Sequence, residues 1–398
     1  MVDSFLGQAE EGNKTALLKL QLIGHYIMGG DFSITDLSHE MNLSVPTVTK
    51  LVSELIEEGF VHDFGKQGTA GGRRPNIYGL NPYAGYFVGV DIKKDIITLA
   101  IINFKGQVVD MRDCVPFVME NSVQALDRLC DVVNGFIAKS KIDRAKIFSV
   151  GFNLSGRVNS KTGYSYSYFF VEEEPLTMLL EKRLGCKVYV ENDANAAAYG
   201  EYIAGGAKGY KDAVVITLGT GIGSGIILGG KILRGFNFAA GEMGHNVIVK
   251  DGIQCTCGRK GCWERYASAS ALTRETKAAM QANKNTIMWK MTQDIDHVNA
   301  KLAFDAMAKG DETAKQVVDS WIEYVGVGIA NVINTFEPEV ICIGGGVSNQ
   351  GEVLLAPVRA YAENETKNIT TGKFPKICAC TLHNDAGVIG AAALGNSI

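Results

Sequence analysis

The sequence lacks any long apolar run, and its first residues lack the basic and apolar regions of a signal peptide. A helix that crosses a bilayer needs about 20 predominantly apolar residues, and no stretch of the 398-residue chain approaches that length. The start, MVDSFLGQAEEGNK, is acidic and polar. We therefore expect a cytoplasmic protein with no membrane partner, whose nine cysteines are thiols or metal ligands rather than disulfides.

The sequence also lacks an excess of basic charge. The chain has a net charge of −4, with 21% charged and 46% hydrophobic residues, a profile typical of a soluble globular protein. Residues 1–82 hold six Lys and Arg against ten Asp and Glu, although a DNA-binding module is usually basic. The length favours two or three domains. We place them at residues 1–82, 83–204 and 205–398.

Four potential metal ligands gather in one glycine-rich segment, residues 241–268. They are His245, Cys255, Cys257 and Cys262. Zinc prefers such soft or borderline ligands in a tetrahedron, and Gly258 and Gly261 can supply the positive φ angles of a tight loop. All four ligands are side chains, which leaves no position for water, so the pattern predicts a structural zinc site. The alternative is four unrelated buried residues.

The first eighty residues have the pattern of a winged helix-turn-helix. Apolar residues at helical spacing predict a helix over 15–28. A short helix over 35–41 follows, and Ser44 then caps a helix with Pro46 in its first turn and Gly59 at its end. Two short helices with a tight turn after a first helix form a helix-turn-helix.

Two strand-like pieces after this helix flank a glycine-rich tip, as in a β-wing. A winged helix places its second helix in the major groove, and arginines at the wing tip can enter the minor groove. The predicted DNA contacts are Ser44, Thr47, Thr49, Lys50, Arg73 and Arg74. The alternative is a helical subdomain that packs on the next domain, with the two arginines in a solvated turn.

From residue 83 the sequence predicts a duplicated α/β lobe. Three strands, a helix, a strand, a helix and a strand lead to Asp193, and a similar order follows residue 205. This layout is that of a two-lobed actin-like ATPase fold with a ligand cleft between the lobes. Glycine-rich turns that can face a nucleotide contain Gly219, Thr220, Gly221, Gly223, Gly344, Gly345 and Gly346. Such turns alone are weak indicators, since tight hairpins need the same residues.

Two segments resemble one family, the ROK proteins (repressors, open reading frames and sugar kinases). Gly241-Glu242-Met243-Gly244-His245, followed by the three clustered cysteines and Glu264, is similar to the family's most specific signature. Glu191-Asn192-Asp193-Ala194-Asn195 is similar to its catalytic segment. The N-terminal winged helix resembles that of the repressor branch.

The resemblance implies a sugar site. Its residues would be Gly156, Asn192, Asp193, Glu242, His245 and Glu264. In kinase members the aspartate that corresponds to Asp193 is the general base that takes the proton of the attacking sugar hydroxyl. We expect the metal to hold the neighbouring sugar-contact residues in place.

Three departures from the family pattern bear on function. The first hairpin of an actin-like sugar kinase carries Asp-x-Gly-Gly-Thr, whereas here residues 91–95 read Asp-Ile-Lys-Lys-Asp, which argues against binding of ATP with Mg²⁺. Ser155 stands where many members have proline. The aromatic segment 164–170 favours equally a lid that stacks on a sugar and a packed hairpin.

Three functions follow from these observations. The first is a sugar-responsive repressor that binds operator DNA, as a homodimer or homotetramer, with a sugar or sugar derivative as effector. The second is an ATP-dependent sugar kinase with an appended DNA-binding head. The third is a sugar-binding scaffold that acts through protein partners.

Overall fold

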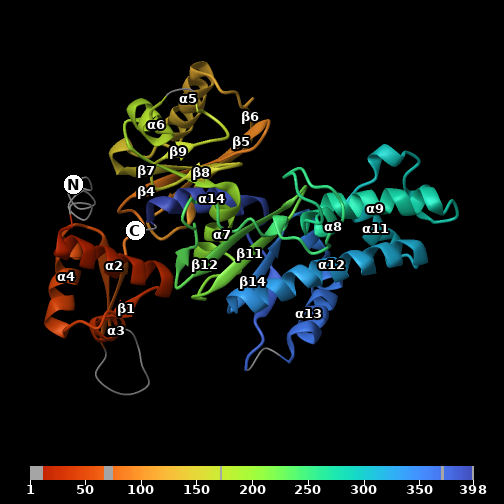
Figure 1. The fold of residues 1–398 in the computed structure, drawn as a ribbon. Coiled ribbons are helices and arrows are strands. Elements are labelled where there is room, and N and C mark those ends of the chain that lie inside the picture. The colour runs from red at the N-terminus through yellow and green to blue at the C-terminus, as the bar shows by residue number, and fades with distance from the viewer. Residues whose placement is uncertain (1–11, 67–74, 171–172, 369–371, 397–398) are drawn as a thin grey trace. The chain divides into compact units, whose positions relative to one another are not determined.

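The computed structural model describes residues 12–66, 75–170, 173–368 and 372–396, which form two compact units (Figure 1). The first unit comprises residues 1–204 and 385–398, and the second comprises residues 205–384. Within the described residues, no helix has the length and apolar character needed to cross a membrane. The arginines Arg73 and Arg74 lie outside the described residues.

The head of the first unit has the order of a winged helix. Its helices are α2 (Lys14–Gly29), α3 (Ile34–Glu40) and α4 (Val45–Glu57), and its strands are β1 (Phe32–Ser33), β2 (Val61–Lys66) and β3 (Asn76–Leu80), in the sheet order β1-β3-β2. Ser33 forms a capping box with Asp36, and the Ser44 side chain accepts from the backbone N–H of Thr47, as the two predicted helix starts require.

The remainder of the first unit is a five-stranded sheet with the order β10-β7-β4-β5-β6. Its strands are β4 (Tyr86–Ile92), β5 (Ile96–Asn103), β6 (Val108–Pro116), β7 (Ile147–Leu154) and β10 (Lys187–Asn192). The helices α5 (Val123–Lys139) and α6 (Leu176–Leu184) share a hydrophobic core with this sheet. The helices α7 (Asp193–Ala204) and α14 (Ala386–Ala393) pack on each other, and α14 also packs on β4 and β7. A small hairpin joins β8 (Val158–Asn159) to β9 (Tyr164–Ser165).

The second unit holds a sheet with the order β13-β12-β11-β14-β15. Its strands are β11 (Ala213–Leu218), β12 (Ile222–Leu228), β13 (Lys231–Ile232), β14 (Val340–Gly344) and β15 (Lys376–Ala379). Its helices are α8 (Glu264–Ala267), α9 (Ala269–Ala282), α10 (Met288–Met291), α11 (Ala300–Met307), α12 (Glu312–Phe336) and α13 (Glu352–Thr366). Trp263 and Trp321 are fully buried in the core beneath this sheet.

The domain prediction differs from the structure at the C-terminus. We expected residues 205–398 to form one lobe, but residues 385–398 belong to the first unit, which also contains both the head and the first lobe. The helix α14, AGVIGAAA, is buried throughout. A helix that is apolar on every side must be covered on every side, and here β4, β7 and α7 cover it.

Candidate functional site

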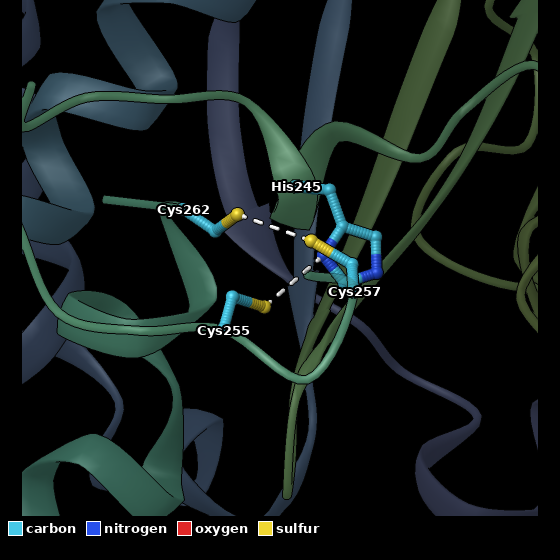
Figure 2. Close-up of side chains that lie close together, drawn as sticks. All are labelled: His245, Cys255, Cys257 and Cys262. Carbon is cyan, nitrogen blue, oxygen red and sulfur yellow. Dashed lines mark hydrogen bonds between the residues drawn. The ribbon is translucent and has the colours of Figure 1, made fainter. Parts of the chain in front are cut away.

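The four predicted metal ligands lie together in the second unit (Figure 2). One ligand atom from each of His245, Cys255, Cys257 and Cys262 falls within 4.8 Å of the others. The Sγ atoms of Cys257 and Cys262 are 3.5 Å apart, and the Sγ of Cys255 is 3.6 Å from Nδ1 of His245. Ligand atoms bound to one zinc at about 2.0–2.3 Å stand roughly 3.5–3.8 Å apart. The donor set and its spacing therefore fit a tetrahedral metal site.

A tight loop brings the cysteines together. Gly258 and Gly261 have φ angles of +90° and +81°, as the sequence predicted. The backbone N–H of Cys255 donates to the carbonyl of Arg259 at 2.8 Å, and the guanidinium of Arg259 donates to the carbonyl of His245 at 2.6 Å. Arg259 thus fastens the histidine to the cysteine loop. The ligand pattern did not single out this residue, although it lies inside the loop.

The thiols of the cluster differ in acidity. A hydrogen bond from the Arg259 backbone lowers the pKa of Cys257 to about 6, whereas burial and the neighbouring Cys257 raise the pKa of Cys262 to about 12. Burial also raises the pKa of Cys255, whose thiol donates to Glu264. A metal ion binds thiolates, so its binding at this cluster would release protons.

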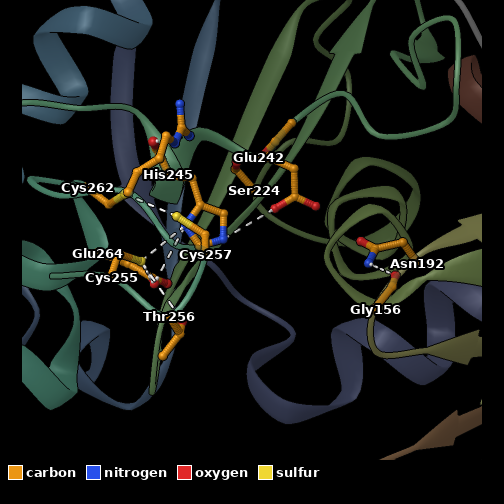
Figure 3. A network of polar contacts seen from close by, with 12 residues as sticks. Gly156, Asn192, Ser224, Glu242, His245, Cys255, Thr256, Cys257, Cys262 and Glu264 are labelled. Atoms are coloured by element: carbon orange, nitrogen blue, oxygen red, sulfur yellow. Dashed lines mark hydrogen bonds and ion pairs between the residues drawn. The ribbon is translucent and has the colours of Figure 1, made fainter. Parts of the chain in front are cut away.

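Two glutamates flank His245 on opposite ring nitrogens (Figure 3). Glu264 Oε1 is 3.7 Å from Nδ1 and accepts a 3.0 Å hydrogen bond from the thiol of Cys255. Glu242 Oε2 is 4.0 Å from Nε2, and its side chain is 62% exposed, against 16% for Glu264. We expected both carboxylates to be free for a ligand. Glu264 instead bonds to the cluster, and a metal that deprotonates Cys255 would remove this hydrogen bond.

In the first unit, Asn192 is hydrogen-bonded to both Gly156 and Asp193. The amide of Asn192 donates to the Gly156 carbonyl at 2.9 Å and to Asp193 Oδ1 at 3.0 Å. The hydroxyl of Ser155 donates to Asp193 Oδ2 at 2.8 Å, across 38 positions of sequence. Ser155, which stands where many family members have proline, therefore donates a hydrogen bond to the carboxylate of Asp193.

The glycine at position 156 is needed for this arrangement. Its φ of +90° is rarely adopted by residues with a side chain, and an added Cβ would lie 2.3 Å from the hydroxyl oxygen of Ser167. In the aromatic segment that contains Ser167, Phe169 is buried, whereas Tyr166 and Phe170 are exposed. Some aromatic residues of the segment therefore pack in the interior, and others are exposed to solvent.

The hairpin at residues 91–95 carries an ion pair. Nζ of Lys93 lies 3.4 Å from Oδ2 of Asp91, whose side chain is only 6% exposed. Burial raises the pKa of Asp91, and the charge of Lys93 opposes that rise. A lysine thus neutralises the aspartate at the hairpin where the kinase pattern has glycines.

The two glycine-rich turns of the second unit contact each other. An added Cβ on Gly345 would lie 2.2 Å from the carbonyl oxygen of Leu218, and one on Gly221 would lie 2.6 Å from Oε2 of Glu264. The turn at residues 219–221 therefore packs against the same glutamate that bonds to the metal cluster, while Gly346 is open to its surroundings. The assignment of Gly219, Thr220, Gly223 and Gly344 to a nucleotide stays a prediction.

The four described DNA-contact candidates lie on the first half of α4. Ser44 and Thr47 are joined through their hydroxyls at 2.8 Å, and the hydroxyl of Thr49 donates to the Val45 carbonyl. Lys50 is 76% exposed. The opposite face of the helix is buried. The exposed side chains of α4 thus include these polar residues together with Val45, which is 47% exposed.

Comparison with known proteins identifies the family of this chain. The ROK family model matches residues 87–397, most of the chain. The chain belongs to the ROK family. This confirms the resemblance to ROK proteins and the α/β fold expected from it.

The ROK relatives fall into two groups. A xylose repressor of Caldicellulosiruptor bescii is 29% identical over 96% of this chain and 94% of its own length. A glucokinase of Streptomyces coelicolor is 34% identical over 78% of this chain and 97% of its own. Among solved structures, a ROK transcriptional regulator, a homolog of the E. coli MLC protein, matches 95% of this chain and 96% of its own, with 26% identity and a TM-score of 0.77. A Streptomyces griseus ROK glucokinase with glucose and AMPPNP covers 78% of this chain and 99% of its own, with 33% identity and a TM-score of 0.64.

Proposed function

We propose that this protein is a sugar-responsive transcriptional repressor. The observation that carries the proposal is the coverage of its relatives: xylose repressors match 85–96% of the chain and the ROK regulator 95%, whereas the glucokinases match 77–78%. The family model begins at residue 87, after the winged-helix head. The head is therefore the part that distinguishes this chain from the glucokinases.

Operator DNA is the proposed ligand of the head. The exposed polar face of α4, with Thr47, Thr49 and Lys50, would enter the major groove, and Arg73 and Arg74 would contact the minor groove. The head carries more acidic than basic residues. Its affinity would therefore rest on few phosphate contacts and on assembly into a homodimer or homotetramer.

The effector would be a sugar or sugar derivative. From the family resemblance we propose Asn192 and Asp193 as sugar ligands in the first unit, with Gly156 shaping the loop that bonds to Asn192. In the second unit the proposed sugar ligands are Glu242, His245 and Glu264. Carboxylates and amides suit vicinal hydroxyls, because they accept from and donate to them. A structural zinc at the cysteine cluster would fix His245 through its Nδ1.

The second candidate is an ATP-dependent sugar kinase. The glucokinase relatives, the retained Asp193 and the glycines at 219–223 favour it. The Lys93–Asp91 ion pair opposes it, because an ammonium already neutralises the aspartate of the first hairpin. Kinase turnover would require ATP with Mg²⁺ at these loops.

One pair of assays separates the two candidates. The DNA upstream of the protein's own gene is titrated with protein, with and without D-glucose or D-xylose, and ATP consumption is followed with the same sugars. The repressor function predicts DNA binding that the sugar changes. A turnover of roughly 1–100 per second would establish the kinase instead.

A further inference from the structure

The strut, which we define as α14 with the 3-10 turn η6 (Leu394–Asn396), is locked to the sheet by main-chain contacts. A Cβ added to Gly89 of β4 would lie 2.0 Å from the carbonyl oxygen of Val388. One added to Gly151 of β7 would lie 1.8 Å from the carbonyl oxygen of Ala391. Only glycine allows backbones to approach this closely, so at Gly89 and Gly151 no side chain of the strand separates it from the strut.

The face of the strut toward α7 is equally close. A Cβ on Gly390 would lie 1.7 Å from the carbonyl oxygen of Ala196, and one on Gly200 would lie 2.1 Å from that of Ala386. The helix α7 begins at Asp193, a proposed sugar ligand. Close-packed interiors resist compression and transmit displacement. A shift of α7 must therefore be taken up by the strut.

The two ends of the strut lie at opposite ends of the strands. At its start, a Cβ on Gly387 would lie 3.1 Å from Oδ2 of Asp91, at the carboxyl end of β4. At its finish, a Cβ on Gly395 would lie 2.1 Å from Oγ of Ser149 and 2.8 Å from the ring of Phe87, at the amino ends of β7 and β4. The strut thus runs from the edge that carries the proposed sugar ligands to the edge nearest the head in sequence.

An aromatic joint occupies that second edge. It consists of Phe60, Phe87, Phe104 and Phe148. The rings of Phe87 and Phe148 pack edge to face, with their centroids 5.5 Å apart. The ring centroid of Phe60 lies 5.5 Å from that of Phe104 and 6.3 Å from that of Phe148. The backbone N–H of Phe60 donates to the carbonyl of Leu55, in the last turn of α4. The end of α4 is therefore hydrogen-bonded to Phe60, whose ring packs against Phe104 and Phe148.

We propose that the strut and the aromatic joint couple sugar binding at Asn192 and Asp193 to the position of α4, with Phe148 as a positioning residue for this coupling. The proposal rests on the repressor function. Sugar binding that moves the start of α7 moves the strut, and the strut moves Phe87 and the rings that hold Phe60. An allosteric link requires one element whose conformation depends on both ligands. In this proposal that element is the aromatic joint, and the ligands are the sugar and the DNA.

The test measures coupling rather than binding alone. The ratio of the Kd for upstream DNA with and without saturating D-glucose or D-xylose is determined by fluorescence anisotropy for wild type and Phe148→Leu. Allosteric ratios are commonly about 5–150-fold. We expect the ratio to fall toward 1 in the variant, while the sugar-free Kd and the thermal shift with sugar stay near wild type. Phe304→Leu, a buried ring outside the joint that contacts Trp321, is the control and keeps the ratio.

A second measurement does not depend on the variant folding. Hydrogen exchange of wild-type amides in α4 and β2 is compared with and without the same sugar, and we expect the sugar to change it. The coupling is overturned if folded Phe148→Leu keeps the wild-type ratio of the two DNA Kd values. It is also overturned if the sugar changes DNA binding but leaves hydrogen exchange in α4 and β2 unchanged. Neither result contradicts the repressor function. Sugar binding and DNA binding with no mutual effect overturn the repressor function itself, and the coupling with it.

Discussion

Nζ of Lys93 lies 3.4 Å from Oδ2 of the buried carboxylate of Asp91. Burial raises the pKa of that carboxyl, and Lys93 opposes the rise. An Asp with a raised folded pKa destabilises the fold once the pH exceeds its unfolded pKa, because the native state must then either keep a proton that the unfolded state has lost or hold a poorly solvated charge. The lysine limits this cost at neutral pH.

Replacing Lys93 should therefore destabilise the protein in a pH-dependent way. We expect Lys93→Met to unfold at lower urea concentration than wild type at pH 7, with a deficit that shrinks as the pH falls below the pKa of Asp91, where the carboxyl is neutral. The exposed neighbour Lys94, replaced by Met, is the matched control. An equal deficit for the two variants, or one independent of pH, would count against the ion pair.

The cluster of His245, Cys255, Cys257 and Cys262 predicts a defined zinc stoichiometry. We expect about one zinc per chain by elemental analysis, since four ligands form one tetrahedral site. Cys257→Ser should lose most of that metal, whereas Cys114→Ser, an exposed cysteine outside the cluster, should keep it. Full metal content in Cys257→Ser would refute the assignment.

A buried ammonium links the first and third helices of the head. Nζ of Lys19 lies 2.8 Å from Glu54 and 2.7 Å from Glu58, and its side chain is 8% exposed. Replacing both glutamates by Gln should cost about 1–3 kcal/mol, less than for a fully buried pair because the carboxylates are 30% and 38% exposed. Lys19→Met should cost less, since an apolar side chain can replace a buried charge.

The pH dependence of that pair has a definite sign. The hydrogen bond from Lys19 lowers the pKa of Glu54, so its contribution is present above the unfolded pKa and is lost as the pH falls through the folded value. Urea titrations at pH 7 and about pH 3 should show a smaller deficit of the double variant at pH 3 than at pH 7. Glu57→Gln, at an exposed position of the same helix, should have little effect at either pH.

The loop at Gly156 offers a local test of the proposed sugar site. Gly156→Ala adds a Cβ within 2.3 Å of Ser167 at a φ of +90°, so the carbonyl that holds Asn192 should shift and sugar affinity should fall. Gly185→Ala has a φ of +67° but no neighbour within 4 Å, and it isolates the backbone strain. Calorimetry with D-glucose or D-xylose compares the two. If Gly156→Ala and Gly185→Ala bind the sugar with equal affinity, the loop at Gly156 is not part of the sugar site.

Local signals predicted much of this molecule. The Ser44 cap, the glycines of the cysteine loop and the clustering of His245 with three cysteines follow from short-range chemistry, and the structure contains each of them. A cap or a tight loop involves only neighbouring residues, so its geometry is encoded in the sequence around it.

Contacts that join distant segments were not predicted. Ser155 reaches Asp193 across 38 positions, and the terminal helix packs in the first unit rather than in the lobe that precedes it. The apolar pattern of α14 indicates burial but not the partner that covers it. Likewise, Glu264 stands in the family motif, but only the fold shows its bond to Cys255.

The central claim is that a sugar changes the binding of this protein to DNA. The most direct measurement is the affinity of the zinc-loaded protein for the DNA upstream of its own gene, by fluorescence anisotropy, with and without D-glucose or D-xylose. We predict specific binding that weakens or strengthens at least several-fold when the sugar is added. Absence of specific DNA binding, together with sugar-dependent ATP turnover, would contradict the claim and establish a kinase.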